Sequence, residues 1–207
     1  LTQVLINTPA GPAGSPTAMG AAYVPSAREE FRDGVRTALE YASVLGTSVV
    51  HVMSGLRPAD ADPDTAFATY VANIGWAADQ ARGTSVRIAL EPINKRDQPA
   101  YGLATMEVAA AVAEAVDPET VGVLFDVYHA QIDGGDLLER FGRLLPRIAH
   151  IQIADNPGRG EPGTGEIAYE RVLAGIAASG YDGWIGCEYG PVAGTVDRLG
   201  WIERIAR

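Results

Sequence analysis

Residues 86–94, VRIALEPIN, begin as an apolar run and end at a carboxylate, Glu91, with a proline directly after it. Three further stretches repeat this pattern around an oxygen-bearing side chain: VGVLFDVYH (121–129) with Asp126, IAHIQIAD (148–155) with Gln152, and WIGCEY (184–189) with Glu188. One such residue at the end of an apolar run carries little information. Four in matching places need a common explanation.

The apolar runs are predicted strands, because they are rich in β-branched residues and are bounded by Gly, Pro or Asp. They lie at 3–7, 48–53, 86–91, 121–126, 149–154 and 184–188. Segments with helical spacing of apolar residues separate them, at 26–46, 64–82, 105–116, 136–146 and 168–180. Strands that are apolar on both faces and alternate with helices predict a parallel sheet covered by helices.

The segment 26–46 has the clearest helical pattern. Ser26 is its expected N-cap, Glu29 follows three residues later as in a capping box, and Gly46 is its expected end. Its apolar residues recur at helical spacing: Phe31, Val35, Ala38, Leu39, Ala42 and Leu45.

Two architectures fit this order: an open doubly wound sheet and a TIM (β/α)8 barrel. No G-x-G-x-x-G follows the first strand, which disfavours a dinucleotide-binding sheet. In a TIM barrel the catalytic groups come from the carboxyl ends of several strands, as the pattern here requires. The barrel is therefore predicted, as one domain over residues 1–207. With six predicted strands and ~30 residues per βα unit, we expect the first two units, roughly 60 residues, to be absent from this chain.

Composition limits the classes of partner. Lys and Arg number 16 against 26 Asp and Glu, a formal net charge of −10, which argues against a nucleic-acid partner. No run reaches the ~18 apolar residues of a membrane helix, and no signal peptide is recognised. The single cysteine, Cys187, favours a cytoplasmic location. We expect it to be a small buried apolar residue.

The four strand-end side chains form a candidate metal site. Glu91, Asp126, Gln152 and Glu188 are 26 to 36 residues apart, about one βα unit each, so they come from successive strands. Carboxylates gathered at a barrel mouth repel one another, and a divalent cation removes that repulsion. All-oxygen ligands favour Mg²⁺ or Mn²⁺. The alternative is that each carboxylate separately caps the following helix or pairs with a lysine.

Four further residues are candidates for substrate binding. His129 follows Asp126 by three residues, and His51 ends a predicted strand. Arg159 lies in a loop rich in Gly and Pro and could hold an anionic substrate through its planar fork. Lys95 follows Glu91 in EPINKRD. An ordinary solvated loop residue is the alternative at each position, and His150 is expected to serve packing.

These motifs together resemble the hydroxypyruvate isomerase family of the xylose isomerase-like barrels. The resemblance runs from LINTPAG through HVMSG, EPINKRD, LFDVYHAQ and HIQIADNPGRGEPGTGEI to GWIGCEYGP, and so covers nearly all of the chain. It implies metal ligands at Glu91, Asp126, Gln152 and Glu188, with Glu91 and Glu188 as the catalytic acid/base pair. Two loops depart from the family: PAGPAGSPTAMGAAYVP, which bears on the substrate, and QPAYGL, where the family often has consecutive aromatic residues.

The resemblance implies interconversion of hydroxypyruvate and tartronate semialdehyde by a metal-assisted 1,2 proton shift through an enediolate. Three alternatives stay open: a 2-oxo-tetronate isomerase, a keto-sugar 3-epimerase, and a non-catalytic barrel fragment. The implied partner is a small hydroxy or oxo acid, and the sequence leaves a homo-oligomer open. A DNA-repair nuclease is disfavoured, because three histidines are too few for a trinuclear zinc site.

Overall fold

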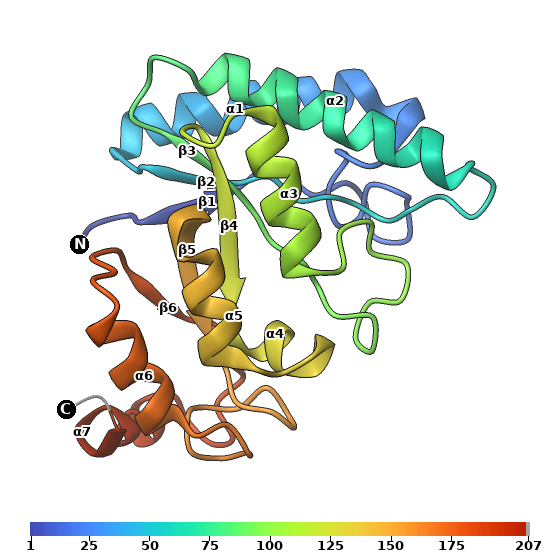
Figure 1. Cartoon of the computed structure of the whole chain (residues 1–207). Helices are drawn as coiled ribbons and strands as arrows, with labels where there is room; N and C mark the ends of the chain where they lie inside the picture. The colour runs from blue at the N-terminus through green and yellow to red at the C-terminus, as the bar shows by residue number, and fades with distance from the viewer. Residues whose placement is uncertain (206–207) are drawn as a thin grey trace.

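The computed structural model describes residues 1–205, which build a parallel sheet and the helices on one of its faces (Figure 1). The six strands pair in chain order from β1 to β6. They are β1 Leu5–Asn7, β2 Val49–His51, β3 Arg87–Leu90, β4 Val121–Asp126, β5 Ile148–Ile153 and β6 Ile185–Cys187. All five pairings are parallel. The predicted parallel sheet and all six predicted strands are confirmed.

The six strands form an open half-barrel. Within residues 1–205, β1 pairs only with β2 and β6 pairs only with β5, so these two strands are the edges of the sheet. The predicted closure into eight strands, with two further βα units, stays a prediction. Edge position also corrects one expectation: Cys187, the last residue of β6, is exposed rather than buried, because within residues 1–205 β6 has a neighbouring strand on one side only.

The helices α1 to α6 lie between successive strands, and α7 follows the last strand. They are α1 Arg28–Leu45, α2 Pro63–Ala81, α3 Met106–Val116, α4 Val127–Asp133, α5 Leu137–Leu144, α6 Tyr169–Ala178 and α7 Trp201–Ile205, with short 3₁₀ turns at Pro25–Ala27, Leu145–Arg147 and Val196–Arg198. Figure 1 shows α1 and α2 side by side, with α3 beside them and α5 and α6 beyond. No helix among the described residues is long and apolar enough to cross a membrane.

The helix at 26–46 is confirmed except at its start. Gly46 ends α1 in a left-handed conformation (φ 67°), as its sequence position predicts. Ser26 does not cap the helix, because it lies inside the preceding 3₁₀ turn and α1 begins only at Arg28, after Ala27. Sequence reasoning also missed α4 and α7, both of which are too short to show a helical period.

Strand alternation divides the sheet into two faces. Residues such as Ile88, Leu90 and Phe125 pack on the outer face in the main core beneath the helices. On the inner face a second, smaller cluster holds Val49, Ala89 and Leu124, with Leu5 and Ala149 packed against it. Both faces of the central strands are therefore apolar, as predicted for a parallel sheet.

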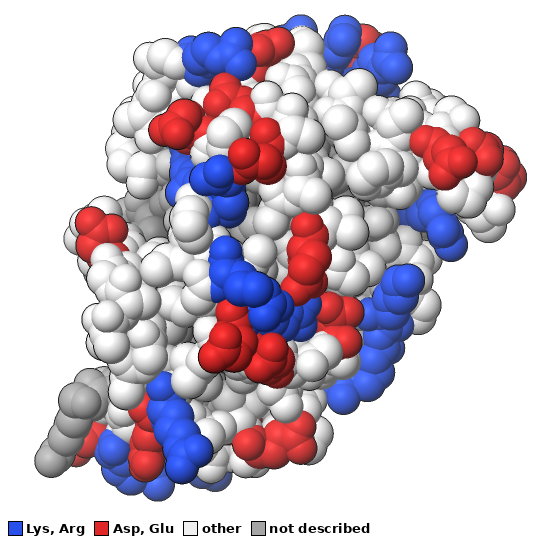
Figure 2. Space-filling model, in the orientation of Figure 1, with Lys and Arg blue, Asp and Glu red and all other residues white. Residues whose placement is uncertain are grey.

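Arg140 connects three helices, α3, α4 and α5, by hydrogen bonds and ion pairs. Arg140 of α5 donates to both carboxylate oxygens of Glu107 in α3, at 3.0 and 2.8 Å. It also donates to Asp133 and to the carbonyl of Ala130, which both belong to α4. Figure 2 shows basic and acidic side chains intermixed over α3 and α5 on this face. The network fixes α4, which carries His129 of the candidate site.

Candidate functional site

One polar side chain from each strand gathers at the carboxyl end of the inner face. Successive side chains of a strand alternate between faces, so residues two positions beyond the inner apolar cluster also lie on the inner face. This places Glu91 after Ala89 and Asp126 after Leu124. We call the set the mouth layer; it consists of Asn7, His51, Glu91, Asp126, Gln152 and Glu188. The structure thus brings together the four predicted strand-end groups.

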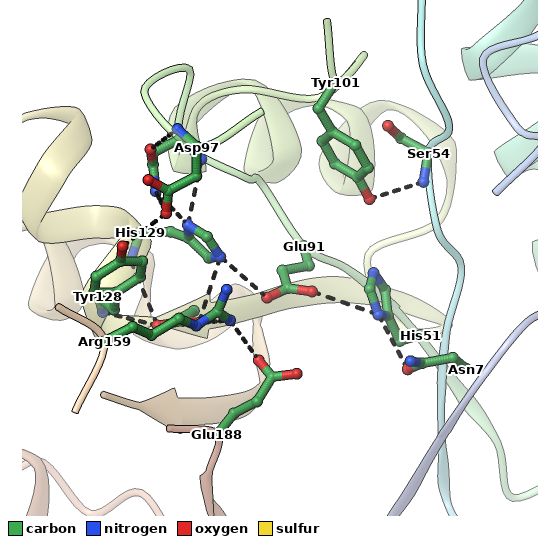
Figure 3. Close-up of polar contacts among 12 residues, drawn as sticks. Asn7, His51, Ser54, Glu91, Asp97, Tyr101, Tyr128, His129, Arg159 and Glu188 are labelled. Atoms are coloured by element: carbon green, nitrogen blue, oxygen red, sulfur yellow. Dashed lines mark hydrogen bonds and ion pairs between the residues drawn. The ribbon is translucent and has the colours of Figure 1, made fainter. Parts of the chain in front are cut away.

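Glu91 lies at the centre of the mouth layer between two histidines (Figure 3). Its Oε2 is 3.5 Å from His51 Nδ1, and its Oε1 is 3.9 Å from His129 Nε2. The Glu91 side chain is only 8% exposed. Burial, together with the charges of Asp126 and Glu188, raises the pKa of Glu91 well above its ordinary value, although Arg159 opposes the shift.

The two carboxylate oxygens of Asp126 have different surroundings. Oδ1 caps α4 by accepting from the backbone N–H of Tyr128 at 2.7 Å and of His129 at 3.4 Å. Oδ2 is buried without a hydrogen-bond partner among the described residues, 3.7 Å from His129 Nε2 and 3.6 Å from Arg159 Nη2. Burial raises the pKa of Asp126 to about 6, against the opposing charge of Arg159. Helix capping alone leaves Oδ2 unused.

Gln152 lies directly beside Asp126, since the two residues pair across β4 and β5. Its Oε1 is also buried without a hydrogen-bond partner. On the other side Gln152 pairs with Gly186 of β6. A Cβ at position 186 would lie 3.0 Å from His150 Nε2 and 3.4 Å from Gln152 Cγ, so glycine gives both inner-face side chains their room. His150 itself is buried, consistent with its expected packing role.

Glu188 lies just past β6, and its carboxylate pairs with Arg159. Arg159 Nη2 donates to Glu188 Oε2 at 2.8 Å, and the guanidinium lies 5.1 Å above the Tyr128 ring. The Glu188 side chain is 52% exposed, in contrast to Glu91. Substrate entering from solvent would reach this pair first.

The loop after β5 directs Arg159 to the mouth layer. The buried carboxylate of Asp155 accepts from the backbone N–H of Asn156, Gly163 and Ile167, at 2.9, 2.8 and 3.1 Å. Arg159 adopts a left-handed backbone (φ 54°), a conformation rare for a side chain other than Gly, Asn or Asp. The Asp155 contacts hold the loop in a shape that aims the guanidinium inward.

The two flanking histidines are held neutral. Burial lowers the pKa of His51 to about 4, with a smaller effect from His150. Burial, then the charge of Arg159, lowers the pKa of His129 to about 3. Neutral imidazoles offer one N–H and one lone pair each, so these residues can donate to or accept from a bound oxygen.

The donor atoms of the mouth fit a cation. Single ligand atoms of Glu91, Asp126 and His129 lie within 4.8 Å of one another. Among the described residues, Asp126 Oδ2 and His129 Nε2, 3.7 Å apart, are both buried without a hydrogen-bond partner, and so is Oε1 of Gln152, which pairs with Asp126 across the strands. Buried polar groups are normally satisfied, so these unpartnered atoms indicate a ligand site. Two donor sets are open: one that uses His129, and one that uses Gln152 and Glu188.

In the loop after Glu91, the residue that faces the site is Asn94 and not the expected Lys95. Lys95 is exposed and forms no hydrogen bond or ion pair to the mouth layer within residues 1–205. Asn94 instead is buried, with its side-chain nitrogen 2.7 Å from His129 Nδ1. Sequence reasoning missed Asn94, Asn7 and Tyr128. Asn94 lies in the stretch 86–94, but polarity and loop position alone give no direction for its side chain.

The fold agrees with comparisons to known proteins. The model of the family described as xylose isomerase-like TIM barrel matches residues 1–205. The chain is 43% identical over 205 residues to a 2-oxo-tetronate isomerase of Cupriavidus necator, and 38% identical to a hydroxypyruvate isomerase of Escherichia coli. In both cases the match covers 98% of this chain and 78% of the relative.

A crystal structure titled AP endonuclease, family 2, from Brucella melitensis superposes with a TM-score of 0.92 at 36% identity, covering 99% of this chain and 78% of that one. A 3-keto-D-glucoside 4-epimerase of Escherichia coli, 18% identical with a TM-score of 0.83 and coverage of 99% and 80%, shares the fold.

The chain belongs to the xylose isomerase-like TIM barrel family. The two curated relatives, which match nearly the whole of this chain, are isomerases. The chain is therefore an enzyme of the isomerase class, and the resemblance seen in its motifs is confirmed.

Proposed function

We propose that this enzyme isomerises a short hydroxy-oxo acid, interconverting hydroxypyruvate and tartronate semialdehyde by a 1,2 proton shift. The observation that carries the proposal is the mouth layer, in which oxygen donors from four strands converge beside one arginine. Such a layer suits a small substrate with adjacent oxygens and a carboxylate. An apolar pocket with few polar groups would have favoured a different ligand class.

The proposed cation is Mg²⁺ or Mn²⁺, held by Glu91, Asp126, Gln152 and Glu188. The unpartnered oxygens of Asp126 and Gln152 support this set. When bound, the cation supplies positive charge that stabilises the negative charge developing on the adjacent substrate oxygens.

Arg159 is proposed to bind the substrate carboxylate. Its guanidinium presents several N–H donors in one plane, which matches a carboxylate. In the substrate-free protein it is paired with Glu188 at 2.8 Å. A substrate carboxylate competes for this arginine and so releases Glu188 from the ion pair. Binding and preparation of an acid/base group are thereby coupled.

Glu91 and Glu188 are proposed to move the protons. One carboxylate removes a proton from C3, the hydroxymethyl carbon of hydroxypyruvate, which gives an enediolate between C2 and C3. The other glutamate, in its protonated form, delivers a proton to C2, while the hydroxyl proton passes from the C3 oxygen to the C2 oxygen. A carboxyl whose pKa is raised toward neutrality, as that of Glu91 is, suits both acid and base roles.

A 2-oxo-tetronate isomerase activity is the second candidate. The specific observation in its favour is the 43% identity to the relative that carries this name. The same residues would perform the same proton shift on an acid one carbon longer.

The decisive experiment measures isomerisation of both acids by the purified chain, with a free ketohexose as a third substrate. EDTA treatment and restoration of Mg²⁺ or Mn²⁺ run in parallel. Turnover of an acid that is lost with EDTA and regained with metal supports the proposal, and the relative kcat/KM values choose between the acids. Preference for the ketohexose would contradict it in favour of an epimerase. A folded chain without turnover or metal binding would support the non-catalytic alternative.

A further inference from the structure

Two N–H groups converge on one nitrogen of His129. The backbone N–H of Asn94 points at His129 Nδ1 over 3.4 Å, and the Asn94 side-chain nitrogen lies 2.7 Å from the same atom. A backbone amide can only donate, so Nδ1 must be the acceptor and carries no proton. In the neutral ring the proton then resides on Nε2.

The amide of Asn94 cannot be turned round to reverse this assignment. Its Oδ1 accepts from the backbone N–H of Asp97 at 2.9 Å, while its Nδ2 donates to Asp97 Oδ2 at 3.1 Å. The Tyr128 hydroxyl donates to the same carboxylate oxygen at 2.7 Å, which holds Asp97 in place. A flipped Asn94 would set oxygen against oxygen and N–H against N–H. The buried Asn94 side chain therefore has one orientation.

We propose that Asn94 is a positioning residue that locks His129 in the Nε2–H tautomer, so that His129 donates to a substrate oxygen and does not ligate the cation. Within residues 1–205, Nε2 is buried without a hydrogen-bond partner, 3.9 Å from Glu91 and 3.7 Å from Asp126. A protonated ring nitrogen has no lone pair for a metal. The substrate part of this inference rests on the proposed function; the tautomer does not.

His51 provides an internal contrast on the other side of Glu91. Its Nδ1 lies 3.2 Å from Asn7 Oδ1, an acceptor, and 3.5 Å from Glu91 Oε2. His51 therefore carries its proton on Nδ1, and its buried Nε2 has no hydrogen-bond partner. His51 and His129, on either side of Glu91, therefore have opposite tautomers. The Asn7 amide oxygen sets the tautomer of His51, and two N–H donors of Asn94 set that of His129.

The tautomers can be measured by two-dimensional ¹H–¹⁵N NMR of the imidazole rings in the metal-free protein, without substrate. The sequence holds only three histidines, so His51→Gln and His150→Gln variants assign the spectrum. We expect a protonated Nε2 and a bare Nδ1 for His129, with the reverse for His51. A proton on Nδ1 of His129, or loss of its Nε2 proton when Mg²⁺ is added, would overturn the inference.

The Asn94→Asp variant tests the cause. A carboxylate in place of the amide accepts from the ring and should move a proton onto His129 Nδ1; an unchanged His129 spectrum would contradict the role of Asn94. Gln98→Glu is the matched control, because it adds the same charge to the same loop and Gln98 forms no side-chain hydrogen bond to His129 among the described residues. Its His129 spectrum should equal that of the parent.

Activity separates this inference from the proposed function. If the parent turns over an acid, Asn94→Asp should lower kcat/KM about 10- to 100-fold, as loss of an orienting partner commonly does, and Gln98→Glu should not. A parent with the expected tautomers but no turnover would defeat the proposed function and leave the assignment of His129 intact. A parent that is active but has the opposite His129 tautomer would support the proposed function and overturn the assignment of His129.

Discussion

Glu91 and Glu188 occupy the same place in their strands but different places in the sheet. Glu91 follows β3, which has strands on both sides, and its side chain is 8% exposed. Glu188 follows β6, an edge strand, and is 52% exposed. The pKa of Glu91 is raised by burial and by its acidic neighbours, whereas Glu188 is paired with Arg159. The electrostatics of each acid depend on whether its strand lies at the centre or at the edge of the sheet. The strand-end pattern in the sequence does not give that position.

The largest effect is expected for Glu91→Gln. It removes one acid/base group and one proposed ligand, so kcat should fall by about 10³-fold or more. Stability should change the other way: because the folded-state pKa of Glu91 is raised, ionisation costs stability as pH rises above about 4.3. The metal-free variant should therefore unfold at a higher temperature than the parent at pH 7. Steady-state kinetics and thermal unfolding measure the two effects, and a less stable variant would contradict the comparison.

Glu188→Gln is expected to cost activity without this gain in stability. A general acid or base contributes about 10²-fold or more, so kcat should fall by at least that factor. The unfolding temperature of the metal-free protein should move little, because the half-exposed carboxylate is already solvated. An unfolding shift as large as that of Glu91→Gln would mean that edge and centre do not differ.

Arg159→Lys tests the partner that distinguishes Glu188 from Glu91. Lysine keeps the charge but loses the planar fork, so KM for the acid should rise about tenfold with a smaller change in kcat. Arg57→Lys is a suitable control, since Arg57 lies on a loop outside the mouth layer. Equal KM values for the parent and Arg159→Lys would remove Arg159 from substrate binding.

The pH dependence of metal binding should reflect the raised pKa values of the two buried acids, Glu91 and Asp126. The pKa of Asp126 is raised to about 6, and that of Glu91 is raised as well, so a cation must displace their protons. Affinity for Mn²⁺ should therefore fall as pH drops below about 6, by roughly tenfold per pH unit for each proton released. Titration calorimetry from pH 5 to 7.5 measures it, with Asp126→Asn as the comparison. A pH-independent affinity would place the ligands elsewhere.

Much of the site could be predicted because parallel strands place their carboxyl ends at one edge. The apolar runs located the six strands, and the strand-end positions of Glu91, Asp126 and Gln152 predicted that they gather at one mouth before any contact was known. The resemblance of the motifs then pointed to the isomerase class that the relatives confirm. These features depend on residue type and spacing, which the chain carries locally.

Contacts between loops distant in the chain could be seen only in the tertiary structure. The sequence by itself determined the strands, the longer helices and the row of strand-end oxygens. Packing decided that Asn94 rather than Lys95 faces His129, that Arg159 meets Glu188, and that Cys187 is exposed. The physical reason is that strand periodicity fixes the direction of a side chain from its own neighbours. A loop side chain instead takes its direction from hydrogen bonds to residues about 30 positions away.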